Sequence, residues 1–291
     1  MGQRLAPPDA RLGDRACMWP FPGFSGTLGA VRVHRFADAS DVDAIRRQLP
    51  SGKEIGGMAN LKDKWTGRFI VLDGPDGSGK GTQLKLLADA LEAEGVPVVL
   101  GKDPGGTEVG DRIRALLLQH DLTGMDPRCE TLLFMASRAQ LVTEVIAPAL
   151  TAGKTVLCDR FISSTCAYQG AAGADCDRII ELGRFAVGST WPDLTLIVDV
   201  PVEEGFRRTG RRPHHAGRRR ASNYDPAQGL LLSDIEPDAM EARPIDFHRK
   251  VRELFLHMPS DYPGHIEVVD GQGSPDEVHQ RIREALAHVD L

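Results

Sequence analysis

The glycine-rich stretch from Leu72 to Gln83, LDGPDGSGKGTQ, constrains the fold of this chain more than any other feature of its sequence. It follows the apolar run Phe69-Ile70-Val71 directly, and apolar residues recur at helical spacing from Leu84 onward. A G-x-x-x-x-G-K loop between a strand and a helix turns backbone N–H groups around phosphate oxygens, while its lysine reaches the β- and γ-phosphates. An ordinary glycine-rich turn would require neither the lysine nor this spacing. We therefore expect a nucleoside triphosphate to bind at Gly74, Pro75, Asp76, Gly77, Ser78, Gly79, Lys80, Gly81 and Thr82.

Short runs rich in valine, isoleucine and leucine alternate with amphipathic helical stretches from Lys64 onward. The runs are nearly continuous in apolar residues, which is typical of parallel strands covered on both faces. The expected strands lie at 69–72, 96–100, 155–158, 194–200 and 266–269, and the expected helices include 84–91, 109–117, 247–258 and 274–286. The pattern predicts an α/β fold of the P-loop NTPase type, in which helices cover both faces of a five-stranded parallel sheet.

Residues 1–64 differ from the rest of the chain, because they carry proline and glycine punctuation and only one short patterned piece. We expect a loosely ordered extension at 1–64 and a single main domain at 65–291. Two alternatives are that the extension docks on the main domain and that translation begins at Met58.

The composition excludes several classes of protein. A formal charge of −6 argues against a general nucleic-acid or membrane-surface binder. The five cysteines form no C-x-x-C pair, and no apolar run approaches the roughly 20 residues of a membrane span. We therefore expect a cytoplasmic protein with no nucleic-acid partner and no membrane association.

Asp159 and Arg160 follow the third expected strand, at the edge of the sheet where open α/β folds bind ligands. A guanidinium there can hold a phosphate with two parallel hydrogen bonds. The neighbouring carboxylate can hold Mg²⁺ or its water shell. The alternative is a structural ion pair between the two side chains that closes the strand.

Four further motifs follow the glycine-rich loop in order: KDPGGT at 102–107, LLFMASR at 132–138, DRFISSTCAYQ at 159–169 and PDLT at 192–195. In order and spacing they resemble the motifs of the thymidylate kinase family, and the resemblance runs from about Phe69 to the C-terminus. It implies a kinase that transfers the γ-phosphoryl group of ATP to dTMP, with Mg²⁺ as cofactor, in a homodimer. Two rival interpretations are an adenylate-kinase-like enzyme and a non-catalytic nucleotide-binding regulator.

The resemblance also implies a binding pocket for dTMP. Phe134 would stack on the thymine ring, and Arg138 and Thr165 would form hydrogen bonds with its edge. Tyr168 would lie against C2′ of the sugar, and Gln169 would complete the pocket wall. Asp76 would face the 3′-hydroxyl group and the acceptor phosphate, which Arg160 would bind. From the residues alone, Phe134 is better explained as a core residue.

The chain departs from the general phosphate-loop motif at one place and from the family pattern at two. Gly81 replaces the Ser or Thr that ligates magnesium in many P-loops, so a hydroxyl ligand would come from elsewhere or from water. Lys102-Asp103 replaces Arg-Glu, so a phosphate or metal contact by that pair is in doubt. Phe161 replaces a tyrosine of the family motif, which removes one hydroxyl group.

A basic run at 207–220 begins a predicted mobile lid that extends to about residue 241. The resemblance implies that this lid supplies a catalytic arginine, because the glycine-rich phosphate loop at 74–82 contains none. Counting from the preceding helix favours Arg212, with Arg208 as second choice. The expected catalytic residues are thus Lys80, Asp159, Arg160 and Arg212, with Asp159 as the metal ligand. The alternative is a solvated basic loop with no catalytic member.

Overall fold

The computed structural model describes residues 61–118, 125–211 and 242–290. Its centre is a five-stranded sheet in which all pairings are parallel and the strand order is β2-β3-β1-β4-β5. The strands are β1 (Phe69–Asp73), β2 (Val98–Lys102), β3 (Thr155–Asp159), β4 (Leu194–Asp199) and β5 (Ile266–Asp270). The predicted fold class is confirmed, and each expected strand overlaps an observed one, although β2 begins and ends two residues later than expected. Every residue of β1 and β4 is buried, as expected for apolar runs covered on both faces.

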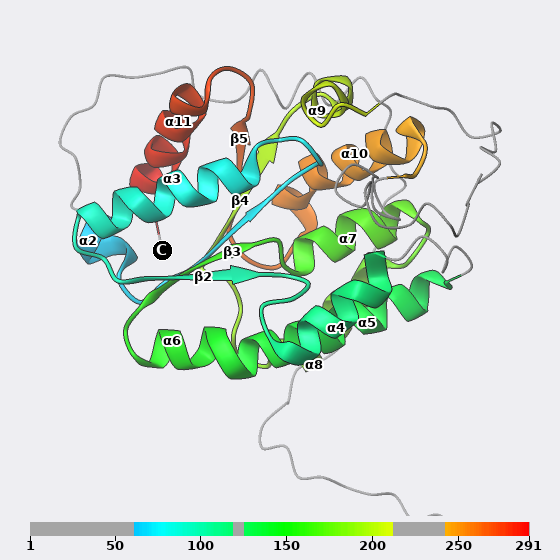
Figure 1. The fold of residues 1–291 in the computed structure, drawn as a ribbon, viewed down its shortest axis with the longest axis horizontal. Helices are drawn as coiled ribbons and strands as arrows, with labels where there is room; N and C mark the ends of the chain where they lie inside the picture. The colour runs from blue at the N-terminus through cyan, green and yellow to red at the C-terminus, as the bar shows by residue number, and fades with distance from the viewer. Residues whose placement is uncertain (1–60, 119–124, 212–241, 291) are drawn as a thin grey trace, which may run out of the picture.

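Helices cover both faces of the sheet (Figure 1). On one face α2 (Leu61–Trp65), α3 (Lys80–Ala93) and α11 (Pro275–His288) enclose a core that includes Leu87 and Ile282. The elements of the other face are α4 (Glu108–Leu118), α5 (Pro127–Leu141), η3 (Val142–Ile146), α6 (Ala147–Thr151), α7 (Ile162–Ala171), α8 (Cys176–Val187) and α10 (Ile245–Asp261). The short helix α9 (Val202–Arg208) follows β4, and α10 lies between α7 and α9 (Figure 1).

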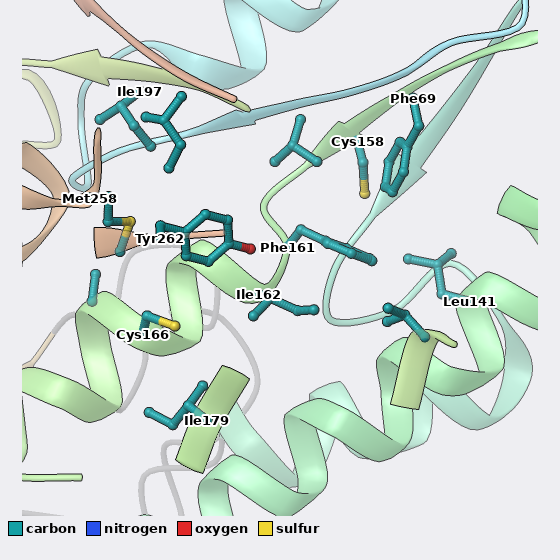
Figure 2. Packing of buried hydrophobic residues seen from close by; sticks show 14 of the residues in the cluster. Phe69, Leu141, Cys158, Phe161, Ile162, Cys166, Ile179, Ile197, Met258 and Tyr262 are labelled. Atoms are coloured by element: carbon teal, nitrogen blue, oxygen red, sulfur yellow. The ribbon is translucent and has the colours of Figure 1, made fainter. Parts of the chain in front are cut away.

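The larger core lies between the sheet and the second helical face (Figure 2). Phe161 is fully buried there and packs edge-on against Phe69, with the ring centroids 5.0 Å apart. The guanidinium group of Arg138 lies over the Phe161 ring, 5.1 Å from the ring centroid. A tyrosine hydroxyl at this position would need a buried hydrogen-bond partner, so phenylalanine suits this apolar site.

The helical stretch Pro127–Thr151, made of α5, η3 and α6, is long and apolar enough to cross a membrane by length and composition alone. Its residues Leu141 and Ile146 are fully buried in the core of the domain. Arg138 and Glu144 interrupt the stretch, so the sequence contains no continuous apolar run there. Burial against the sheet accounts for the apolar side chains of this stretch.

The described part of the chain begins inside the predicted extension. Leu61 to Lys64 form helix α2 together with Trp65, whose side chain is fully buried in the core shared with α3 and α11. The Lys64 ammonium group donates to the Ala287 carbonyl, 2.9 Å away, near the end of α11. Residues 1–60, including Met58, lie outside the described residues.

Two glycines let the phosphate loop and α9 approach each other closely. A Cβ atom on Gly77 would lie 2.3 Å from the Gly205 carbonyl oxygen, and one on Gly205 would lie 2.3 Å from the Asp76 carbonyl oxygen. Gly77 also has a φ of +74°, which side chains rarely adopt. The loop therefore rests on the backbone of α9, so α9 fixes its position.

Gly205→Ala tests this contact. Alanine is the better helix former, but here its Cβ would push α9 and the loop apart, so we expect a loss of about 1–3 kcal/mol of unfolding free energy. Gly81→Ala is the control, because a Cβ there meets nothing within 4 Å. It should be neutral or stabilise the protein by up to about 1 kcal/mol. Urea unfolding measures both, and equal effects of the two substitutions would contradict the close approach.

Candidate active site

The loop between β1 and α3 has the shape that phosphate binding requires. Gly74 has a φ of +130°, and a Cβ there would lie 2.3 Å from the Val198 carbonyl oxygen. Helix α3 begins at Lys80, so its first backbone N–H groups face the loop. The buried Lys80 ammonium group donates to the carbonyl oxygens of Gly74 and Pro75, each 2.9 Å away. Burial, followed by the charge of Arg160, lowers the pKa of Lys80 to about 8.

The Asp76 carboxylate contacts side chains from three other segments of the chain. Its Oδ1 atom accepts from Arg160 Nη2 at 2.6 Å and from the Tyr168 hydroxyl at 2.8 Å. Its Oδ2 atom lies 3.2 Å from Arg211 Nη2, just after α9. Burial alone would raise the pKa of Asp76, but the charges of Arg160, Lys80 and Arg211 lower it to about 2. Asp76 is therefore ionised and joins the loop to α7 and α9.

Arg160 has a φ of +69°, the only positive φ of a non-glycine residue in the described chain. Such backbone strain is common at functional sites. The guanidinium Nη1 donates to Ser164 Oγ at 3.0 Å and lies 3.6 Å from Asp73 Oδ1. Although burial would lower the pKa of Arg160, the charges around it, Tyr168 and Asp76 first, hold that pKa well above its usual range. Arg160 thus pairs with Asp76 of the loop and with Asp73 of β1.

One carboxylate oxygen of Asp159 has no hydrogen-bond partner among the described residues. Its Oδ1 atom is buried and accepts no hydrogen bond from any described residue. The negative charge of Asp159 acts on Lys80, so the two groups lie in the same site. A buried carboxylate oxygen beside a phosphate loop fits Mg²⁺, which binds oxygen ligands. Among the described residues no cluster of three metal-binding side chains occurs, so such an ion would take its other ligands from phosphates and water.

A pocket of about 690 Å³, including its open mouth, lies next to the loop. Its wall contains all the residues predicted for the dTMP pocket, namely Asp76, Phe134, Arg138, Arg160, Thr165, Tyr168 and Gln169. Phe134 is half-buried at the pocket and belongs to none of the core clusters, so the core interpretation of this residue is not supported by its position.

Arg138 is completely buried and contributes to the wall of this pocket. It pairs with Asp103, with Nε 2.6 Å from Oδ2, and its Nη2 atom donates to Thr165 Oγ1 at 3.2 Å. Burial raises the pKa of Asp103, and the charge of Arg138 opposes that shift. Asp103 therefore serves as the counter-ion of Arg138. Its neighbour Lys102 is exposed.

The structure adds two residues of the site that the sequence did not indicate, one in the pocket wall and one beside Asp76. Arg114 of α4 lines the pocket and donates to the Pro104 carbonyl oxygen at 3.0 Å. His248 of α10 is buried, with Nδ1 3.8 Å from Asp76 Oδ2. The sequence carries no signal for Arg114, because it is one of several charged residues on an amphipathic helix. His248 lies after the basic run, far from any motif.

The basic run is described only as far as Arg211. Arg208 donates through Nη1 and Nη2 to the Gly271 carbonyl oxygen, 3.1 Å from each, and pairs with Glu204. Arg211 pairs with Asp76 of the phosphate loop. Arg212, the first choice for the catalytic arginine, lies outside the described residues, as does the rest of the predicted lid to residue 241.

Comparison with known proteins gives a consistent result. Residues 72–228 match the Thymidylate kinase family. A thymidylate kinase of Syntrophotalea carbinolica is 43% identical over 215 residues, which are 74% of this chain and 92% of the relative. One from Herpetosiphon aurantiacus is 41% identical, over 69% of this chain and 87% of the relative.

A solved structure agrees with these sequence relatives. The crystal structure of thymidylate kinase from Ehrlichia chaffeensis superimposes with a TM-score of 0.56 at 31% sequence identity. It covers 76% of this chain and 98% of the other. The family match extends over more than half of the chain, and the relatives are matched over most of their length. The chain that carries this phosphate loop and the adjoining pocket therefore belongs to the thymidylate kinase family.

Proposed function

We propose that this protein transfers the γ-phosphoryl group of ATP to the 5′-phosphate of dTMP, which yields dTDP and ADP. The observation that carries the proposal is the junction at Asp76. This residue belongs to the phosphate loop, lines the neighbouring pocket and pairs with Arg160. A nucleotide in the loop and a second nucleotide in the pocket would therefore meet with their phosphates beside the same cations.

The loop and Lys80 would hold the β- and γ-phosphates of ATP. Arg160 and Arg114, which both line the pocket, would hold the phosphate of dTMP. A phosphate monoester is already a nucleophile near neutral pH, so the reaction requires no strong general base. Phosphoryl transfer is accelerated by alignment and by neutralisation of the charge of the two anions. An arginine of the basic run would add to this neutralisation.

Asp159 would hold Mg²⁺, together with phosphate oxygens and water. Its buried and unpartnered Oδ1 atom supports this assignment. When bound, Mg²⁺ would supply positive charge at the β- and γ-phosphate oxygens. Gly81 offers no hydroxyl ligand, so the carboxylate of Asp159 would be the ligand that the protein supplies at this position, and any hydroxyl ligand would come from elsewhere or from water.

The pocket also suits thymine and deoxyribose. Phe134 would stack on the base, and Arg138 and Thr165 would form hydrogen bonds with its edge. The Tyr168 hydroxyl group donates to Asp76, which holds the ring in the pocket wall, and there it would exclude a 2′-hydroxyl group. Gln169 completes the wall. These contacts favour dTMP over purine and ribose monophosphates.

We also propose a cellular location and an oligomeric state for this protein. We propose a cytoplasmic location, which is supported by the free thiols of the described cysteines, Cys129, Cys158, Cys166 and Cys176. We also propose a homodimer on the basis of family membership. Large apolar side chains are exposed on neighbouring helices of one face, with Leu132 of α5 exposed by 56% and Phe185 of α8 by 89%. Such side chains are candidates for burial in a subunit interface.

The central test measures ADP release with dTMP, dUMP, AMP, CMP and GMP as acceptors. We expect turnover to be highest with dTMP. Lys80→Ala should lower turnover about a thousandfold or more while the fold stays intact, because the lysine neutralises phosphate charge. Lys85→Ala is the matched control, because Lys85 is exposed on the same helix. Substantial activity in the Lys80 variant, or a preference for AMP, would refute the assignment.

Arg114→Ala tests the acceptor phosphate site. Loss of a charged hydrogen bond to that phosphate should lower kcat/KM for dTMP about tenfold or more, with little change in KM for ATP. Arg112→Ala is the control on the same helix, because the Arg112 side chain is 78% exposed and forms a surface ion pair with Glu108. Steady-state kinetics with each substrate varied in turn measures both. If the two variants behave alike, Arg114 has no role at the acceptor phosphate.

Sedimentation equilibrium tests the homodimer. We expect a mass of twice the 31.6 kDa of one chain. Phe185→Asp should shift the equilibrium toward the monomer, because burying a carboxylate in an apolar interface is unfavourable. A wild-type mass of one chain at micromolar concentration would contradict the proposal.

A further inference from the structure

Glu130 lies in the first turn of α5, on the helix face that forms the pocket wall. Phe134 and Arg138 follow it at intervals of four residues, so all three share that face. Glu130 is not part of the pocket wall, but its Oε2 atom accepts from Gln169 Nε2 at 3.2 Å. Gln169 is completely buried on α7 and does line the pocket. Glu130 therefore acts on the pocket through Gln169.

The contact with Glu130 decides which end of the Gln169 amide is left for the pocket. An ionised carboxylate only accepts hydrogen bonds, so the amide must present its NH₂ group to Glu130. The carbonyl oxygen, Oε1, then has no partner: it is buried and accepts no hydrogen bond from the described residues. Buried acceptors without a partner are rare in native proteins, and such a group at a pocket wall calls for a donor from the ligand.

Arg243 holds Glu130 in this position. Its Nη2 atom lies 2.8 Å from Glu130 Oε1 and 3.1 Å from Oε2. The Arg243 guanidinium group also lies over the ring of Phe247, 4.6 Å from the centroid, and this ring is 6.4 Å from that of Tyr168 in the pocket wall. The side chains of the pair are only 23% and 12% exposed, so solvent screens their attraction less than that of a surface pair.

We propose that Glu130, fixed by Arg243, is a positioning residue that determines which pyrimidine the enzyme accepts. It orients the Gln169 amide so that a carbonyl oxygen faces the base. Thymine and uracil carry a ring N3–H group that can donate to this oxygen. Cytosine carries a lone pair at N3, so two acceptors would face each other. The inference rests on the proposed function, because it assumes that the base of the acceptor nucleotide occupies this pocket.

The test compares dTMP, dUMP and dCMP in the Glu130→Gln variant. This substitution keeps the size of the side chain but can donate as well as accept, so it no longer fixes the amide of Gln169. We expect KM for dTMP and for dUMP to rise together by about tenfold, because a buried hydrogen bond is weakened. The inhibition constant of dCMP against dTMP should stay the same or fall. KM for ATP should change less than about twofold, because the phosphate loop is not touched.

Arg243→Ala should likewise raise KM for dTMP and for dUMP without raising the inhibition constant of dCMP, and Arg243→Lys should restore part of this selectivity. Arg249→Ala is the matched control, because Arg249 lies on α10 in an exposed ion pair with Glu203 and should leave these three constants unchanged. Equal weakening of dTMP, dUMP and dCMP in the Glu130 variant, or no change in any of them, would overturn the inference. If the wild-type protein does not phosphorylate dTMP at all, the proposed function fails instead.

Discussion

The carboxylate of Asp76 is the interaction on which the rest of the site depends. It sits in the phosphate loop, yet its partners come from the segment after β3, from α7 and from the chain after α9. A buried carboxylate is tolerated only when cations and donors surround it, so the loop, α7 and α9 must take fixed positions around this one group. The same carboxylate borders the pocket, so the loop and the pocket are aligned by one set of contacts.

Close backbone packing supports this arrangement from the other side of the loop. The loop lies directly against Gly205 of α9 and against Val198 of β4, where no side chain could be accommodated. The glycines of the loop thus serve two purposes, because they turn N–H groups inward and let the loop rest on the sheet and on α9. Rigid support of this kind is what charge stabilisation by fixed dipoles requires.

The sequence predicted most of the fold and part of the site. Continuous apolar runs located all the strands, because a strand buried on both faces has few alternatives. Motif spacing located the loop, whereas Phe134 and Arg138 were assigned to the pocket only through the family resemblance. Arg114 could not be found in this way, since Arg112 has the same chemistry two residues earlier on the same helix. Which of the two faces the pocket depends on how α4 packs on α5, and a single amphipathic pattern does not fix that rotation.

The same limit applies to Asp103 and Gly205. The sequence did not show what Lys102 and Asp103 contact. Only the buried position of Arg138 in the structure shows that Asp103 is the counter-ion of Arg138. Gly205 lies inside a short helix, where alanine would have the higher propensity, and only the neighbouring loop explains the glycine. Contacts between segments distant in the chain decide both cases, whereas local patterns decide strands and helix caps.

The balance of charge around the loop indicates what else the reaction needs. Among the described residues, Lys80, Arg160 and Arg211 stand close to Asp73, Asp76 and Asp159, so positive and negative side chains are equal in number. Two nucleotides would add several negative charges to this balanced cluster. Neutralising them requires cations from outside it, such as Arg114 in the pocket wall, Mg²⁺ at Asp159 and arginines of the basic run. The cluster therefore orients the substrates, and these additional cations would supply the excess positive charge that phosphoryl transfer requires.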